Sequence, residues 1–140
     1  MTAMPANDAR RPPILTRRIR AHLQRIAVKA ETITYKALAD AVGVAPPNTV
    51  HQVTEALEHL ILEDAANGHP FIAALVVSRA RGGLPAPGFF DCASRAGRFH
   101  HDLSGPEAWI FHRAEFDAAV AFWSAAAEPA ETDEAPLVRE

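Results

Sequence analysis

The chain has 140 residues, 49% apolar and 22% charged, and this balance predicts a globular protein with a single hydrophobic core. No run approaches the roughly 18 apolar residues that a membrane span needs, and the N-terminus lacks a signal-peptide core. The one cysteine excludes an internal disulfide framework and a cysteine-rich zinc site. We therefore expect a cytoplasmic protein of bacterial type, without a membrane partner.

The formal net charge of −3 is unevenly distributed. Residues 1–36 hold eight of the fourteen basic residues and two of the seventeen acids, so this segment carries +6 and the remainder carries −9. A protein with a basic end and an acidic body can contact phosphate on one face and repel it on another.

Residues 1–12 carry Arg10 and Arg11 among prolines and few apolar residues, which predicts a flexible basic arm. A single domain over 13–127 is expected to follow, and its first helix begins near Pro13. An apolar stripe on that helix is formed by Leu15, Ile19, Leu23 and Ile26. The arginines expected to project away from this stripe are Arg17, Arg18, Arg20 and Arg25.

The segment "ETIT" is rich in β-branched residues and predicts a short strand. Thr34 is placed to cap the next helix, Tyr35 to about Val42, and Gly43 to end it. After the turn "GVAPPN", Thr49 with Gln52 fits a capping box, and Asn48 is the rival cap. The long helix that follows is expected to run to about Ala66.

This long helix has an unusual charge for one that reads DNA. From Thr49 to Asn67 there is no lysine or arginine, and the acids there are Glu55, Glu58, Glu63 and Asp64.

The apolar run Phe71–Ser78 predicts a buried strand, and "RARGG" predicts a loop that exposes Arg79 and Arg81. "GFFDCASRAG" is long enough for one or two helical turns. A last helix opens near Ser104 and Pro106, with one face formed by Trp109, Phe116, Val120 and Trp123. We expect these aromatic residues to pack on the core, and residues 128–140 to form an acidic disordered tail.

This order of elements predicts an α+β fold that is mainly helical: a winged helix-turn-helix over about 13–84, with an added C-terminal helix. The segments "ITYKALADAVG" and "HPFIAALVVSRARGGL" resemble the winged-helix domain of the O6-alkylguanine DNA alkyltransferase and alkyltransferase-like family, over about 30–84. Thr34-Tyr35 with Leu38-Ala39 match its helix start, and Val76-Val77 with Gly82-Gly83-Leu84 match its later part.

The resemblance implies a fold and duplex binding but not alkyl transfer. When Val76-Val77 are aligned with the family motif, its nucleophilic cysteine falls on Ala73, and Ala74 and Leu75 replace its histidine and arginine. An alanine supplies no thiolate.

The sequence therefore predicts non-enzymatic nucleic-acid binding, to double-stranded DNA, by a small regulator or accessory factor. Phosphate contacts are assigned to Arg17, Arg18, Arg20, Arg79 and Arg81, contacts at the start of the long helix to Thr49, His51 and Gln52, and a further contact to Tyr35. Either only the start of the long helix meets DNA, or phosphate is held elsewhere, or this is a protein-interaction module that presents its acidic helix and tail to a basic partner.

Two groups of residues could suggest a metal site or a catalytic site. His51, Glu55, His59 and Glu63 share one helix face, but the histidines are two turns apart, so a solvated face is favoured over zinc. The only cluster that suggests catalysis is Cys92, His100 and Asp102. We expect no metal, no cofactor and no enzymatic activity.

Overall fold

The protein is described here by a computed structural model covering residues 14–100 and 105–134, with side chains described as far as residue 126. It is mainly helical, with one two-stranded sheet, so the α+β part of the prediction is confirmed. The larger elements are α2 (Ile14–Val28), α3 (Tyr35–Val42), α4 (Thr49–Ala66), α5 (Pro87–Arg95) and α6 (Pro106–Glu134). The smaller ones are β1 (Ile33–Thr34), β2 (Val76–Val77) and the 3-10 helices η1 (Ile72–Leu75) and η2 (Arg79–Arg81).

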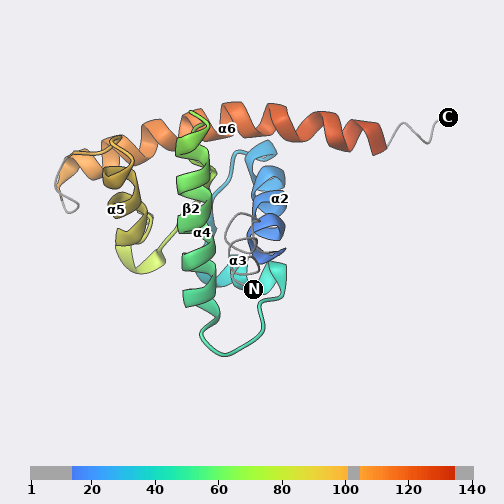
Figure 1. Ribbon diagram of the computed structural model, residues 1–140, viewed down its shortest axis with the longest axis horizontal. Helices are drawn as coiled ribbons and strands as arrows, with labels where there is room; N and C mark the ends of the chain where they lie inside the picture. The colour runs from blue at the N-terminus through green and yellow to red at the C-terminus, as the bar shows by residue number, and fades with distance from the viewer. Residues whose placement is uncertain (1–13, 101–104, 135–140) are drawn as a thin grey trace, which may run out of the picture.

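Helix α4 stands at the centre, with α2 and α5 on either side, and α6 lies crosswise over the carboxyl ends of α2 and α4 (Figure 1). The turn that leads into α4 is at the opposite end of the molecule (Figure 1). The start of α4 is therefore not covered by the C-terminal helix.

The helix boundaries around the turn agree with the sequence. The Thr34 hydroxyl accepts a hydrogen bond from the Ala37 amide at 3.1 Å and so caps α3 as expected. Gly43 ends α3 with φ of 69°, a left-handed conformation that glycine adopts without steric cost. Helix α4 ends at Ala66, where it was expected to end.

The capping box expected at Thr49 and Gln52 is wrong. Asn48 occupies the N-cap position with φ of 60°, and its side chain makes no capping hydrogen bond. The Gln52 amide instead donates to the carbonyl oxygens of Ala45 and Pro47, both at 2.9 Å. The Gln52 side chain therefore stabilises the turn between α3 and α4.

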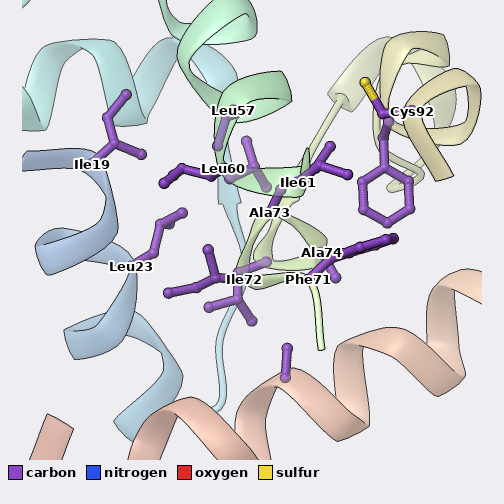
Figure 2. Close-up of a cluster of buried hydrophobic side chains, with 14 of the residues drawn as sticks. Ile19, Leu23, Leu57, Leu60, Ile61, Phe71, Ile72, Ala73, Ala74 and Cys92 are labelled. Carbon is purple, nitrogen blue, oxygen red and sulfur yellow. The ribbon is translucent and has the colours of Figure 1, made fainter. Parts of the chain in front are cut away.

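Residues 71–77 are all buried in the core. They do not form the buried strand that the sequence predicts over Phe71–Ser78 (Figure 2). The segment is mostly η1, and only Val76 and Val77 are extended, in parallel register with Ile33 and Thr34. Two acids explain the difference: Glu115 accepts the Phe71 amide at 2.8 Å, and Asp64 accepts the Ile72 amide at 3.0 Å. Side chains thus satisfy amides that a strand partner would otherwise satisfy.

The chain from Ser78 to Leu84 forms a loop and not the two-stranded hairpin expected of a winged helix. Ser78 and Leu84 form a single antiparallel bridge, and η2 lies between them. Gly82 and Gly83 turn the chain with positive φ angles of 71° and 106°. Pro85 follows and has no amide to extend the ladder.

Helix α6 buries a slightly different face from the one that the sequence predicts. Trp123 is buried, while Phe116 and Val120 are half-buried, as expected. Trp109 is 48% exposed, because the buried stripe runs one residue earlier, through Ala108, His112, Ala119 and Trp123. Helix α6 also continues beyond Ala127 to Glu134, into the segment expected to be disordered. The expected arm at 1–12 lies outside the described residues.

Candidate nucleic-acid interface

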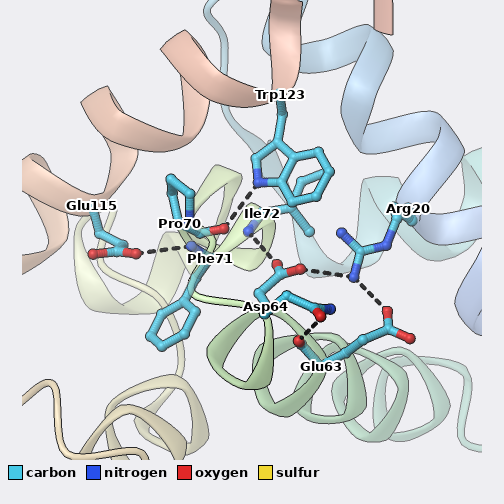
Figure 3. A network of polar contacts seen from close by, with 9 residues as sticks. Arg20, Glu63, Asp64, Pro70, Phe71, Ile72, Glu115 and Trp123 are labelled. Atoms are coloured by element: carbon cyan, nitrogen blue, oxygen red, sulfur yellow. Dashed lines mark hydrogen bonds and ion pairs between the residues drawn. The ribbon is translucent and has the colours of Figure 1, made fainter. Parts of the chain in front are cut away.

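The expected phosphate contact Arg20 is part of an internal network beneath α6 (Figure 3). Its Nη2 atom lies 2.6 Å from Glu63 Oε1 and 2.9 Å from Asp64 Oδ1, and its guanidinium stacks 4.8 Å from the Trp123 ring centroid. Burial raises the pKa of Asp64, and the amide of Ile72 and the charge of Arg20 oppose that rise. Arg20 offsets the cost of burying the Asp64 carboxylate, so its guanidinium serves the fold and not the candidate interface.

The other two α2 arginines expected to contact phosphate, Arg18 and Arg17, lie in different places. Arg18 donates to the Val42 carbonyl and so completes the C-terminus of α3 beside the turn. Arg17 lines a hollow with Leu60 and Glu63, at the later turns of α4. Hence the expected arginine cluster of α2 does not converge on the start of α4.

Tyr35 has a structural role at the first turn of α3. Its hydroxyl accepts the Ala86 amide at 2.8 Å and so links α3 to the segment that precedes α5. Burial raises the pKa of Tyr35 to about 12, and the hydrogen bond from Ala86 opposes that rise. The phenol is therefore neutral at physiological pH and available as a donor from the wall of the neighbouring groove.

This groove lies between the first turn of α3, the first two turns of α4 and the loop after β2, and has a volume of about 620 Å³. We call it the α3–α4 groove; it is lined by Thr34, Tyr35, Lys36, Ala37, Asp40, Val50, Thr54, Val77, Ser78, Arg79 and Ala86. Two cations from separate elements border it: Lys36 of α3, and the exposed Arg79 of η2. Lys36 pairs weakly with Asp40 at 3.7 Å, and both side chains are largely exposed.

At the start of α4 the expected contact residues are present but largely engaged. Thr49, the first residue of the helix, is half-buried, and His51 is exposed, with its Nε2 atom 3.2 Å from Glu55 Oε2. Gln52 is held by the turn, as described above. The Thr54 hydroxyl donates to the Val50 carbonyl at 3.0 Å. Val50 itself is 43% exposed and borders the groove.

The two loop arginines, expected to act together, have different environments. Arg79 is exposed, and no hydrogen bond or ion pair within residues 14–100 and 105–134 holds its guanidinium. Arg81 is half-buried: it donates to the Pro85 carbonyl at 2.6 Å and lies 5.8 Å from the Phe90 ring centroid. Arg79 is free to bind a phosphate, whereas Arg81 holds the loop on α5.

The residues considered for catalysis are not arranged for it. Cys92 is fully buried, and burial and the charge of Glu58 raise the pKa of its thiol, although Arg95 donates to its Sγ atom at 3.1 Å. A buried thiol with a raised pKa is a weak nucleophile. The Nε2 atom of His100 lies 3.0 Å from the Gly97 carbonyl oxygen, which accepts the hydrogen bond, and Asp102 lies outside the described residues. Ala73, at the position of the family's cysteine, is buried against α4.

Within the described parts of the chain, no three histidine, cysteine or acidic residues lie close enough together to hold a metal ion. The described helices also include none with the length and apolar character of a membrane span.

Lys36 and Val50 were not among the interface residues predicted from the sequence. A lone lysine inside a helix and a valine within an apolar stripe carry no signal by themselves. Only the folded arrangement brings both beside Arg79. A comparison with protein-family models, curated proteins and solved structures found no match to this chain.

Proposed function

We propose that the protein binds double-stranded DNA through the end of the molecule formed by α3, the turn and the start of α4. The observation that carries this proposal is the convergence of Lys36 and Arg79, from separate elements, on the groove beside the first two turns of α4. Both are exposed, and the turn before α4 lies at the opposite end of the molecule from α6 (Figure 1).

The order of elements supports treating α3 and α4 as a helix-turn-helix with a short wing. In that arrangement the second helix approaches the bases with its first turns, and nearby cations bind the backbone. The later turns of α4 carry Glu58, Glu63 and Asp64 and lead away from this end, toward α6 (Figure 1). The acids of α4 therefore do not prevent its first turns from contacting DNA. We assign phosphate binding to Lys36 and Arg79.

This proposal revises the expected residue set. Lys36 joins Arg79 as a phosphate contact, and Thr49, Val50 and His51 approach the bases. Arg18, Arg20, Gln52 and Arg81 are engaged in intramolecular contacts that support the fold. The resemblance to the alkyltransferase-like family is compatible with duplex binding. The alanine at position 73 lacks the thiol that alkyl transfer needs, and we include a regulatory or accessory role in the proposal.

The experiment is a mobility shift with random-sequence duplex DNA at low and at physiological salt, using Lys36→Ala and Arg79→Ala. We expect each substitution to weaken binding and to reduce the slope of log K against log salt by about one, because each cation displaces a condensed counterion.

Arg113→Ala is the matched control for Lys36→Ala. Arg113 pairs with Asp117 four residues later, as Lys36 pairs with Asp40, but it lies on α6. The proposal is wrong if the wild-type protein gives no shift at low salt, or if Arg113→Ala weakens binding as much as Lys36→Ala does.

The second candidate is a protein-interaction module. It is favoured by the combination of exposed acid and exposed apolar surface on α4, namely Glu55, Val50 and Leu62. An absence of any shift at low salt would favour this candidate over DNA binding.

A further inference from the structure

We infer that α4 reads DNA through the methyl groups of thymine, with Val50 as the residue that determines specificity. This inference rests on the proposed function. It concerns which base is preferred, whereas the proposal above concerns whether DNA is bound.

Three polar side chains near the start of α4, those of Gln52, Thr54 and His51, make contacts within the protein. Gln52, whose amide would otherwise read adenine, donates to the carbonyls of Ala45 and Pro47. The Thr54 hydroxyl donates to the Val50 carbonyl. The His51 ring lies 3.2 Å from Glu55, which satisfies one of its ring nitrogens.

Direct readout of guanine is also lacking on this helix. The usual readers of guanine are arginine and lysine, and α4 contains neither. Arg79 and Lys36 lie on other elements, where they border the groove and suit backbone phosphates.

Beside the exposed His51, the first turn of α4 also presents hydrocarbon to the solvent. Val50 is 43% exposed and lines the α3–α4 groove together with Thr54. Because the Thr54 hydroxyl is turned back to the helix backbone, its outward chemistry is also that of a methyl group. In the major groove the one apolar feature of a base edge is the C5-methyl of thymine.

The experiment first selects preferred duplexes from a random pool at low salt, and then replaces each thymine in turn with deoxyuridine, which lacks the methyl group. We expect a loss of about fourfold in affinity at one position or more, the effect of removing one buried methyl contact. For Val50→Ala, whose shorter side chain withdraws both γ-methyl groups from the thymine methyl, we expect deoxyuridine and thymine to bind nearly equally.

Val28→Ala is the matched control, because Val28 is also 43% exposed and lies at the far end of α2. It should keep the preference of the wild-type protein for thymine. Thermal unfolding of each variant checks that the exposed valines do not alter the fold.

The possible results distinguish DNA binding itself from the preference for thymine. If duplexes bind but no deoxyuridine substitution matters, or if Val50→Ala keeps the preference for thymine, this inference is overturned and DNA binding stands. If no duplex binds at low salt, both fail, and the exposed Val50 belongs to a protein interface.

Discussion

At the scale of single residues, the buried polar groups show most clearly what the fold requires. Asp64 and Glu115 each accept a backbone amide at the entrance to η1, and Trp123 donates to the Pro70 carbonyl at 2.9 Å (Figure 3). These contacts join α4, η1 and α6 through buried and half-buried polar groups. The sequence alone did not reveal them, since Glu115 and Asp64 look like ordinary surface acids.

His112 is the buried titratable group with the clearest consequence for pH. Its Nε2 atom lies 2.8 Å from the Ala74 carbonyl, and burial lowers its pKa, an effect opposed by that hydrogen bond. The folded protein therefore takes up a proton at lower pH than the unfolded chain, whose histidine titrates near 6.5. Stability is complete above that pH and falls as the pH drops below it.

We expect urea denaturation to give a lower free energy of unfolding at pH 5 than at pH 7. His112→Gln keeps a donor for the Ala74 carbonyl and should have a flatter dependence on pH. Some dependence should remain, because burial also lowers the pKa of His22. An identical pH profile for His112→Gln and the wild-type protein would contradict the assignment.

At the scale of elements, helix boundaries set by local chemistry were the most predictable part of the fold. Thr34 and Gly43 define α3 because a cap and a left-handed glycine act within a few residues. Phe71–Ser78 was not predictable as η1 plus β2, because a continuous apolar run specifies burial and not backbone geometry. The acids that decide its geometry come from α4 and α6.

The turn between α3 and α4 gives a prediction at this scale. Gln52→Ala removes both side-chain hydrogen bonds that hold Ala45 and Pro47, and we expect the free energy of unfolding to fall by about 1–2 kcal/mol. His51→Ala is the adjacent control, and a loss within about 0.5 kcal/mol is expected for an exposed side chain. Equal losses in chemical denaturation of the two variants would show that Gln52 does not hold the turn.

The candidate interface was predictable only in part, again for physical reasons. Arg79 was identified correctly as an exposed loop cation, because a glycine-rich loop lies at the surface. Arg20 and Arg18 have partners within the fold that the sequence did not indicate, because Asp64 and Val42 are 44 and 24 positions away. Charge in a sequence indicates the number of cations but not which ones the fold engages.

At the scale of the whole molecule, α6 packs against α2 and η1 and lies across the end of α4 (Figure 1). Among the described side chains, the last one that α6 buries is Trp123. Removing α6 would expose Ile72 and Ala74 and would leave the Phe71 amide without its acceptor Glu115. Cooperativity of the fold should therefore depend on the first two thirds of this helix.

Two truncations test this. A chain that ends at residue 126 should unfold within a few degrees of the full chain, whereas a chain that ends at Gly105 should lose its cooperative thermal transition. Circular dichroism during heating measures both. A cooperative transition in the shorter chain would show that the α2–α4 core folds without α6.

The burial of Cys92 has a practical consequence. It is the only cysteine in the sequence, and its shielded thiol will react slowly with maleimide reagents. A cysteine introduced at the exposed Ala126 can therefore carry a fluorescent dye on its own. Such a label sits on α6, remote from the turn before α4, so anisotropy titrations can follow complex formation without an obstructing fluorophore.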